Sequence, residues 1–149
     1  MQERFGIIVL SPTQNGLKKI QLEAARIVPG LTSYASILSI YKETGWEKLS
    51  VRREKRKLSL FYDIVNGHSP DYLQDLLPIT VGQINNYNLR NSKNFTIPPG
   101  RLSLYQSSFF PSTIRLWNNL PTDLRNSPCQ QMFKNEIRKV YDMPDKPPL

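Results

Sequence analysis

Apolar residues recur along much of the chain every three or four positions, which is the spacing that one face of a helix requires. This pattern predicts a first helix over residues 17–28, which Pro29 and Gly30 end. A second helix is predicted to follow, with Ser33 as its N-cap and Gly45 as its C-terminal stop. The apolar positions of these two helices are Leu17, Ile20, Ala24, Ile27, Val28, Tyr34, Ile37, Leu38 and Tyr41.

The longest predicted helix runs from Ser50, its candidate N-cap, to Gly67. Burying a Leu or Phe side chain contributes about 1.5–3 kcal/mol, whereas a cation cannot be buried without a partner. We therefore expect the apolar stripe of this helix to face inward and its cations to face water. The stripe comprises Val51, Leu58, Phe61, Tyr62 and Val65, and the cations on the opposite side are Arg52, Arg53, Arg56 and Lys57.

The pattern becomes weaker after this helix. The stretch "SPDYLQDLLP" predicts a short helix with Pro70 near its first turn and with Tyr72, Leu73, Leu76 and Leu77 on its apolar side. From residue 78 to residue 107 no helical period is visible, and the stretch "QINNYNLRNSKN" is rich in Asn. We expect either short extended segments around the Pro-Pro-Gly turn or irregular chain that wraps the helical core.

Helical spacing returns in "SFFPSTIRLWNNLP", where Pro111 suits a first turn and Ile114, Trp117 and Leu120 share one face. Pro121 ends this helix and can begin a short one through Leu124. A last helix is predicted from Ser127, with Pro128 at its first position and with Gln130 completing a capping box. Its apolar stripe comprises Met132, Phe133, Ile137, Val140 and Tyr141.

These elements predict a mainly all-α fold, a small multi-helix domain with an irregular or short extended segment near residues 78–107. The helical domain is expected over residues 17–141, after an irregular segment at residues 1–16 and before a disordered tail at residues 142–149, where Pro residues prevent a helix. The predicted core residues are Phe61, Phe109, Phe110, Ile114, Trp117, Phe133 and Ile137.

Composition adds a strong positive charge to this picture. The 149 residues carry a net charge of +8 and have a pI of about 9.7, which favours an anionic partner, such as nucleic acid or an acidic membrane surface, over a surface kept basic only for solubility. The apolar stretch "FGIIVL" is too short to span a membrane or to form a signal-peptide core. A single Cys cannot form an internal disulfide, so an intracellular location, in the nucleus or cytoplasm, is expected.

Candidate catalytic groups are sparse. The carboxylates are scattered singly, without the Asp clusters that hold Mg²⁺ in polymerases and nucleases. No Gly-rich phosphate loop and no nucleophile elbow is present. His68 and Cys129 are the only pair on which a hydrolase could be built, and a solvated His68 is the simpler interpretation. We therefore expect no catalytic residue, no metal site and no cofactor.

Cations form the clearest candidate site. Six of them lie within ten residues, and Glu54 is the only acid among them. Further along, "YNLR" and the residues up to Tyr105 interleave aromatic and cationic groups, as binders of single strands do, although such aromatics also anchor loops to a core. The candidate nucleic-acid-binding residues are Lys48, Arg52, Arg53, Lys55, Arg56, Lys57, Arg90, Lys93 and Arg101, with Tyr87, Phe95 and Tyr105 interleaved in the second group.

Five segments in order carry a resemblance to one family. They are "KIQLEAARIVPGL", "TGWEKLSVRREKRKLSLFYDIVNGHSPDYLQDLLP", "YNLRNS", "SFFPSTIRLWNNLP" and "FKNEIRK", within residues 11–141. Together they resemble the C-terminal tail of reverse transcriptases encoded by non-LTR (LINE-type) retrotransposons. Residues 1–10 do not follow the family closely.

The resemblance implies a non-catalytic fragment of an RNA-directed DNA polymerase. The family's Tyr-x-Asp-Asp strand, its other metal-binding Asp residues and the endonuclease that often precedes it do not occur in this sequence. Such a tail is expected to hold template RNA or target DNA near the polymerase, with the basic helix at residues 50–66 in contact with it. Two alternatives remain open at this point: a helical protein-interaction module, and an orphan fragment without a selected function.

Overall fold

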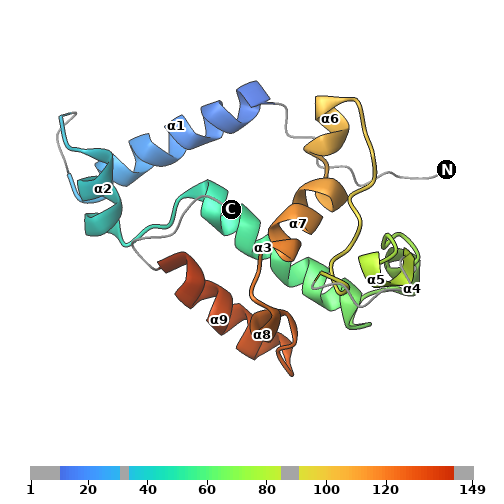
Figure 1. Cartoon of the computed structure of the whole chain (residues 1–149). Helices are drawn as coiled ribbons and strands as arrows, with labels where there is room; N and C mark the ends of the chain where they lie inside the picture. Colours follow the sequence, from blue (N-terminus) through green and yellow to red (C-terminus); the bar gives the residue numbers. More distant parts are fainter. Residues whose placement is uncertain (1–10, 31–33, 85–90, 143–149) are drawn as a thin grey trace. The chain divides into compact units, whose positions relative to one another are not determined.

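Figure 1 shows a computed structural model of the chain, which describes residues 11–30, 34–84 and 91–142. The expected all-α class is confirmed, because helices dominate these residues and their only β-pairing is an isolated antiparallel bridge between Thr80 and Phe95. The helices are α1 (Ser11–Ile27), α2 (Ile37–Thr44), α3 (Leu49–Val65), α4 (Asp71–Gln74), α5 (Val81–Ile84), α6 (Ser103–Gln106), α7 (Phe109–Asn118), α8 (Thr122–Arg125) and α9 (Gln130–Asp142).

The chain divides within α3, between Arg53 and Glu54, into two compact units. The described part of one unit runs from residue 11 to residue 53, and that of the other from residue 54 to residue 142. The single helical domain expected over residues 17–141 stays a prediction. Residues 1–10 and 143–149, which include most of the irregular segment and of the tail predicted from the sequence, lie outside the described residues.

The unit of residues 11–53 is built on the packing of α1 against α2. Gln21 on α1 connects this pair to the start of α3: its Nε2 donates to the Glu47 carbonyl at 2.8 Å, and its Oε1 accepts from the Leu49 N–H at 3.2 Å. Only Ala25 and Ile40 are fully buried among the described residues of this unit. The contact face between two helices is narrow, so one small side chain from α1 and one larger side chain from α2 can fill it.

Most of the apolar positions that the spacing identified in these two helices are exposed. The two buried residues, Ala25 and Ile40, were not among them. The exposed residues are Leu17, Ile20, Ile27, Val28, Tyr34, Ile37 and Leu38.

The ends of these helices also differ in part from the prediction. α1 begins at Ser11, so residues 11–16 are helical rather than irregular; Pro12 suits a first turn, where its missing N–H costs nothing. Ser36 caps α2, since its Oγ accepts from the Ser39 N–H at 3.1 Å, while Ser33 lies outside the described residues. Gly45 ends α2 as predicted, with a φ of 63° that side chains disfavour.

The unit of residues 54–142 holds an aromatic core between α3, α7 and α9. The Phe61 and Trp117 rings lie 5.1 Å apart between centroids, and the Tyr62 and Phe133 rings stack at 4.5 Å. Trp117 also approaches Phe133, at 5.7 Å. The buried cluster comprises Leu58, Phe61, Tyr62, Ile114, Trp117, Leu120, Leu124, Phe133 and Ile137.

The structure places five of the seven predicted core residues in this buried cluster. Phe109 and Phe110 are half-buried and pack against it. Within α3 the stripe also includes Ile64, which is buried although it was not predicted. The helix begins at Leu49, so Ser50 is a helical residue rather than the N-cap, and Gly67 follows its end with a φ of 74°.

The segment between α3 and α7 contains short helices that the apolar pattern did not predict. α4 has the expected place, but Tyr72 and Leu76 of its predicted apolar side are exposed. α5 and α6 each have a single turn. The extended chain around Phe95 pairs with residues 79–81, where Thr96 N–H donates to the Ile79 carbonyl at 3.0 Å.

The beginning of α9 corrects another prediction. Ser127 and Gln130 do not form a capping box: the Ser127 hydroxyl donates to the Leu124 carbonyl at 2.6 Å, and Gln130 Nε2 donates to Asp63 Oδ2. The helix starts at Gln130 because the preceding residues complete the turn after α8. Met132, predicted to be buried, is exposed.

Candidate nucleic-acid interface

The candidate interface is centred on the first half of α3. Its sequence, "LSVRREKRKLSLFYDIV", combines good helix formers with the apolar residues that anchor its second half in the core. Along this single continuous helix, residues four apart lie on the same face. Lys48 precedes the helix by one residue, and its carbonyl accepts from the Arg52 N–H at 3.1 Å. Lys48, Arg52 and Arg56 therefore follow one row along α3.

The charges of α3 oppose the helix dipole. The first turn contains no acid and the last turn no base, although the N-terminal end of a helix favours anions and disfavours cations by about 0.3–1 kcal/mol each. Arg52 and Arg56 are also like charges at a four-residue spacing, which destabilises an isolated helix by about 0.2–0.5 kcal/mol. The burial of Leu58 and Phe61 further along α3 offsets these costs.

Two of the predicted cations on α3 are exposed and one is half-buried in the unit of residues 11–53. Lys48 and Arg52 are exposed, while Arg53 is half-buried. In the unit of residues 54–142, Arg56 is exposed and Lys55 and Lys57 are half-buried. Arg53 and Lys57, predicted to lie opposite the apolar stripe, are thus less exposed than Arg52 and Arg56.

Lys55 and Lys57 have partners within their own unit. Lys55 Nζ lies 3.5 Å from Asp142 Oδ1 and 5.7 Å from the centroid of the Tyr141 ring. Lys57 Nζ donates to Ser112 Oγ at 2.9 Å. These two side chains hold α9 and α7 to α3, so their charges are less available to a ligand than the charge of Arg56.

The neighbouring acid, Glu54, is also engaged. The Tyr141 hydroxyl donates to Glu54 Oε2 at 2.9 Å. Burial raises the pKa of Tyr141 well above its ordinary value, and the hydrogen bond to the Glu54 carboxylate raises it further. At neutral pH this tyrosine is therefore a stable donor to Glu54.

The structure describes four residues of the second predicted group: Lys93, Phe95, Arg101 and Tyr105. Lys93 and Arg101 are exposed, whereas Arg90 and Tyr87 lie outside the described residues. Phe95 packs edge-on against Phe61, with centroids 5.5 Å apart. The Tyr105 ring lies against Gly100, where a Cβ would clash with it. These two aromatics anchor their loops, which was the alternative interpretation of the sequence.

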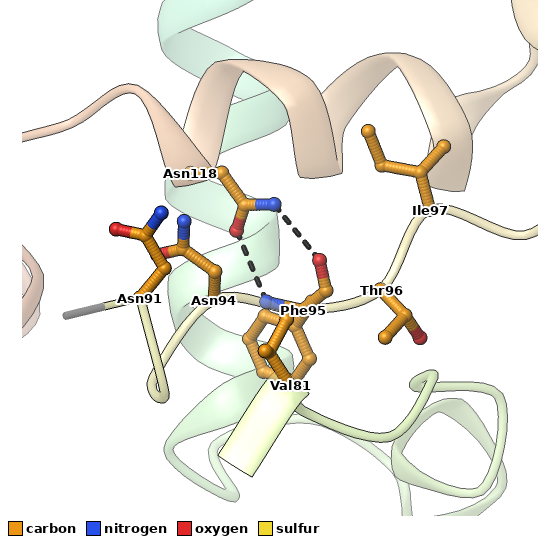
Figure 2. A pocket seen from close by; sticks show the side chains of 7 residues that line it. All are labelled: Val81, Asn91, Asn94, Phe95, Thr96, Ile97 and Asn118. Carbon is orange, nitrogen blue, oxygen red and sulfur yellow. Dashed lines mark hydrogen bonds between the residues drawn. The ribbon is translucent and has the colours of Figure 1, made fainter. Parts of the chain in front are cut away.

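A groove that the sequence analysis missed runs beside α7. Its first cavity, of about 650 Å³, is lined by the apolar residues Val81, Phe95 and Ile97 and by the polar residues Asn91, Asn94, Thr96 and Asn118 (Figure 2). A second cavity of about 250 Å³ shares Ile97 and Asn118 with the first and adds Arg115 and Asn119. We call the two adjoining cavities the α7 groove. The Asn-rich composition of residues 85–94 was its only signal in the sequence.

Hydrogen bonds fix two of the Asn side chains in the α7 groove. Figure 2 shows Asn118 reaching from α7 to the backbone of Phe95, where its Oδ1 accepts from the N–H at 3.1 Å and its Nδ2 donates to the carbonyl at 2.8 Å. Asn94 Oδ1 accepts from Arg125 Nη1 at 2.8 Å. Burial lowers the pKa of Arg125, which nonetheless remains charged at neutral pH.

The other candidate chemistry finds little support in the geometry. Cys129 and His68 are both exposed, and no hydrogen bond joins them in the part of the chain that the structure describes. The same part contains no group of three His, Cys, Asp or Glu side chains that could hold a metal ion. Within the described ranges, none of the helices combines the length and apolar character needed to cross a bilayer.

Comparison with known proteins returned no match: no family model, no curated protein and no solved structure is similar to this chain. The resemblance to retrotransposon reverse transcriptases therefore stays a prediction based on the five segments quoted above.

Proposed function

We propose that this chain is a non-catalytic nucleic-acid-binding protein whose basic residues on α3 contact phosphate groups. The observation that carries the proposal is the exposed row of Lys48, Arg52 and Arg56 at the N-terminal end of α3. This arrangement is unfavourable in the free protein and becomes favourable when an anion binds, because a phosphate would reduce both the repulsion between the cations and their conflict with the helix dipole. A net charge of +8 supports the same kind of partner.

The role that the resemblance implies fits this proposal. A C-terminal segment of an RNA-directed DNA polymerase would bind template RNA or target DNA through phosphate contacts, without taking part in the chemistry. Contacts to phosphate position a protein on a nucleic acid but read no sequence. We therefore expect α3 to bind RNA and DNA with little sequence preference.

The proposal is tested by binding across a salt series. A fluorescent twenty-base-pair duplex is titrated with the full chain and with the variant Arg52→Gln/Arg56→Gln, and binding is followed by anisotropy. The logarithm of the affinity should fall with the logarithm of the salt concentration by about 0.9 for each phosphate contact, so the variant should lose about 1.8 from this slope. A salt-independent affinity, or a variant that binds like the natural chain, would show the proposal to be wrong.

A matched control separates this site from overall charge. Lys18 and Lys19 on α1 are exposed, so Lys18→Gln/Lys19→Gln removes the same charge elsewhere and should change the slope much less. Stability gives a second control: without the two α3 cations the free protein should be unchanged or more stable, by up to about 1 kcal/mol. Weaker binding by a variant of undiminished stability cannot come from unfolding.

A protein-interaction module is the second candidate, and it is supported by the exposed apolar residues of α1 and α2. Ile27 and Leu38 are each 77% exposed, and Tyr34 is 97% exposed. Such apolar surface is typical of interaction sites. If a second copy covers it, sedimentation velocity should show concentration-dependent association that Leu38→Ser abolishes. A monomer at all concentrations would argue against self-association.

A further inference from the structure

The α7 groove has features of a ligand site apart from α3. Its first cavity has a volume within the range of small-molecule sites, and it joins apolar residues to a few polar groups, as such sites do. Among the residues that the structure describes, no carboxylate lines either cavity. The groove lies wholly within the unit of residues 54–142, so it can be considered independently of the cations before Glu54.

One cation lines the groove, and two more are close to its lining residues in contact or in sequence. Arg115 lines the second cavity and is exposed, and its Nη1 makes a long contact of 3.5 Å with the Gln106 carbonyl. Arg125 lies behind Asn94, to which it donates. Lys93, in the loop between Asn91 and Asn94, is also exposed. A groove with Arg115 in its lining and with no acid among its described lining residues complements an anionic chain.

The carboxamides of the groove suit the edge of a nucleobase. An Asn side chain presents an acceptor and donors together and pairs with the hydrogen-bonding edge of adenine. Asn94 Oδ1 accepts a hydrogen bond from Arg125, which leaves the amide nitrogen of Asn94 to donate to another group. Asn91 is exposed beside it (Figure 2). The apolar residues that line the same cavity, Val81, Phe95 and Ile97, can contact the face of a base.

We propose that the α7 groove binds an unpaired segment of nucleic acid, with a base at the amides of Asn91 and Asn94 and with a phosphate at Arg115. Bases are accessible in this way only in single strands, because in a duplex they are stacked and paired. This inference rests on the proposed function and adds to it a preference for unpaired bases. The α3 row would contact phosphates of any strand, whereas the groove requires a base.

The test compares two strands that differ only in their bases. One is a labelled strand of eight deoxyadenosines, and the other is an abasic strand with the same eight sugars and phosphates. The full chain should bind the adenine strand about tenfold more tightly, which is the gain expected from one good base contact. Asn91→Ala should reduce this ratio to about twofold, and Arg115→Gln should weaken binding of the adenine strand about fivefold.

Matched variants on α9 serve as controls. Asn135→Ala and Arg138→Gln make the same changes at exposed positions that do not line the groove, and both should leave the ratio within twofold of that of the natural chain. Arg52→Gln/Arg56→Gln should weaken binding of both strands and leave their ratio unchanged. Thermal melts establish that each variant is folded before binding is compared.

The remaining outcomes would contradict the groove proposal, and one of them would also contradict the proposal for α3. Equal affinities for the two strands in the natural chain would refute the groove proposal, while salt-dependent binding of both would still support the role of α3. A tenfold ratio that survives Asn91→Ala would place the base elsewhere and refute it as well. If neither strand binds at low salt, both proposals are wrong. If a peptide of eight glutamates competes as well as the adenine strand, and Arg115→Gln weakens this competition whereas Arg52→Gln/Arg56→Gln does not, the groove binds a peptide instead.

Discussion

Replacing Trp117 by Ala tests whether the aromatic core stabilises the unit of residues 54–142. Trp117 is 3% exposed, and its ring lies 5.1 Å from that of Phe61 and 5.7 Å from that of Phe133. A buried aromatic side chain removes 150–250 Å² from water, which at about 25 cal/mol per Å² corresponds to about 4–6 kcal/mol. The methyl group of Ala keeps part of this burial free energy, and partial collapse of the cavity recovers a further part of it. We therefore expect the free energy of unfolding to fall by about 3–5 kcal/mol.

The assay is urea unfolding followed by far-UV circular dichroism, which does not depend on the fluorescence that the substitution removes. Tyr72→Ala is the matched control, since this aromatic lies in the same unit and is 65% exposed; it should cost no more than about 0.5 kcal/mol. A loss below about 1 kcal/mol for Trp117→Ala would contradict the packing described here.

Three further predictions follow from local geometry. Asn118→Ala removes both hydrogen bonds to the Phe95 backbone and should cost about 1–3 kcal/mol, with faster hydrogen exchange at the Phe95 amide as the direct measurement. Gly45→Ala should lower the free energy of unfolding by about 1–2 kcal/mol, because the φ of Gly45 is 63°. Gly16→Ala should instead stabilise the chain by up to about 1 kcal/mol in thermal melts, because Gly16 lies inside α1 and no atom is near the new Cβ. Because burial and a carboxylate partner raise the pKa of Tyr141, its contribution to stability is complete below about pH 10 and is lost as the pH rises beyond it. Tyr141→Phe should flatten this alkaline loss in melts recorded from pH 8 to pH 12, and an unchanged pH profile would contradict the assignment.

The core of the unit of residues 54–142 could be predicted because it depends on spacing within single helices. Ile114, Trp117 and Leu120 recur every three residues and are all buried. The same holds for Leu58 and Phe61 on α3. In each case the apolar stripe is wide and one side of the helix is clearly polar, so one burial pattern is favoured.

Spacing was misleading where a helix has too few neighbours to bury its apolar face. The α1 sequence has a clear apolar period, yet Ile20 and Ile27 are exposed and Ala25 is buried. Spacing indicates which residues share a face, but the partner decides how much of that face is covered. One-turn helices such as α5 and α6 are too short to show a period at all.

The α7 groove could not be predicted because its contacts join residues far apart in the sequence. Asn118 meets Phe95 across 23 positions, and Arg125 meets Asn94 across 31. Asn residues in a loop indicate turns and exposure, and nothing in their local sequence tells which of them will face a cavity. The basic row on α3 was visible because consecutive cations on one helix need no tertiary contact to be recognised.

The two-sided hydrogen bonding around Phe95 has a consequence for self-association. On one side, the neighbouring Asn94 carbonyl accepts from Val81 N–H and Thr96 N–H donates to Ile79; on the other, the Asn118 carboxamide satisfies both backbone groups of Phe95. A side chain thus occupies the place of an adjacent strand. At Phe95 the backbone N–H and carbonyl are therefore already paired and cannot bind the edge of a second molecule. A short extended segment can thus exist in a helical protein without becoming a template for aggregation.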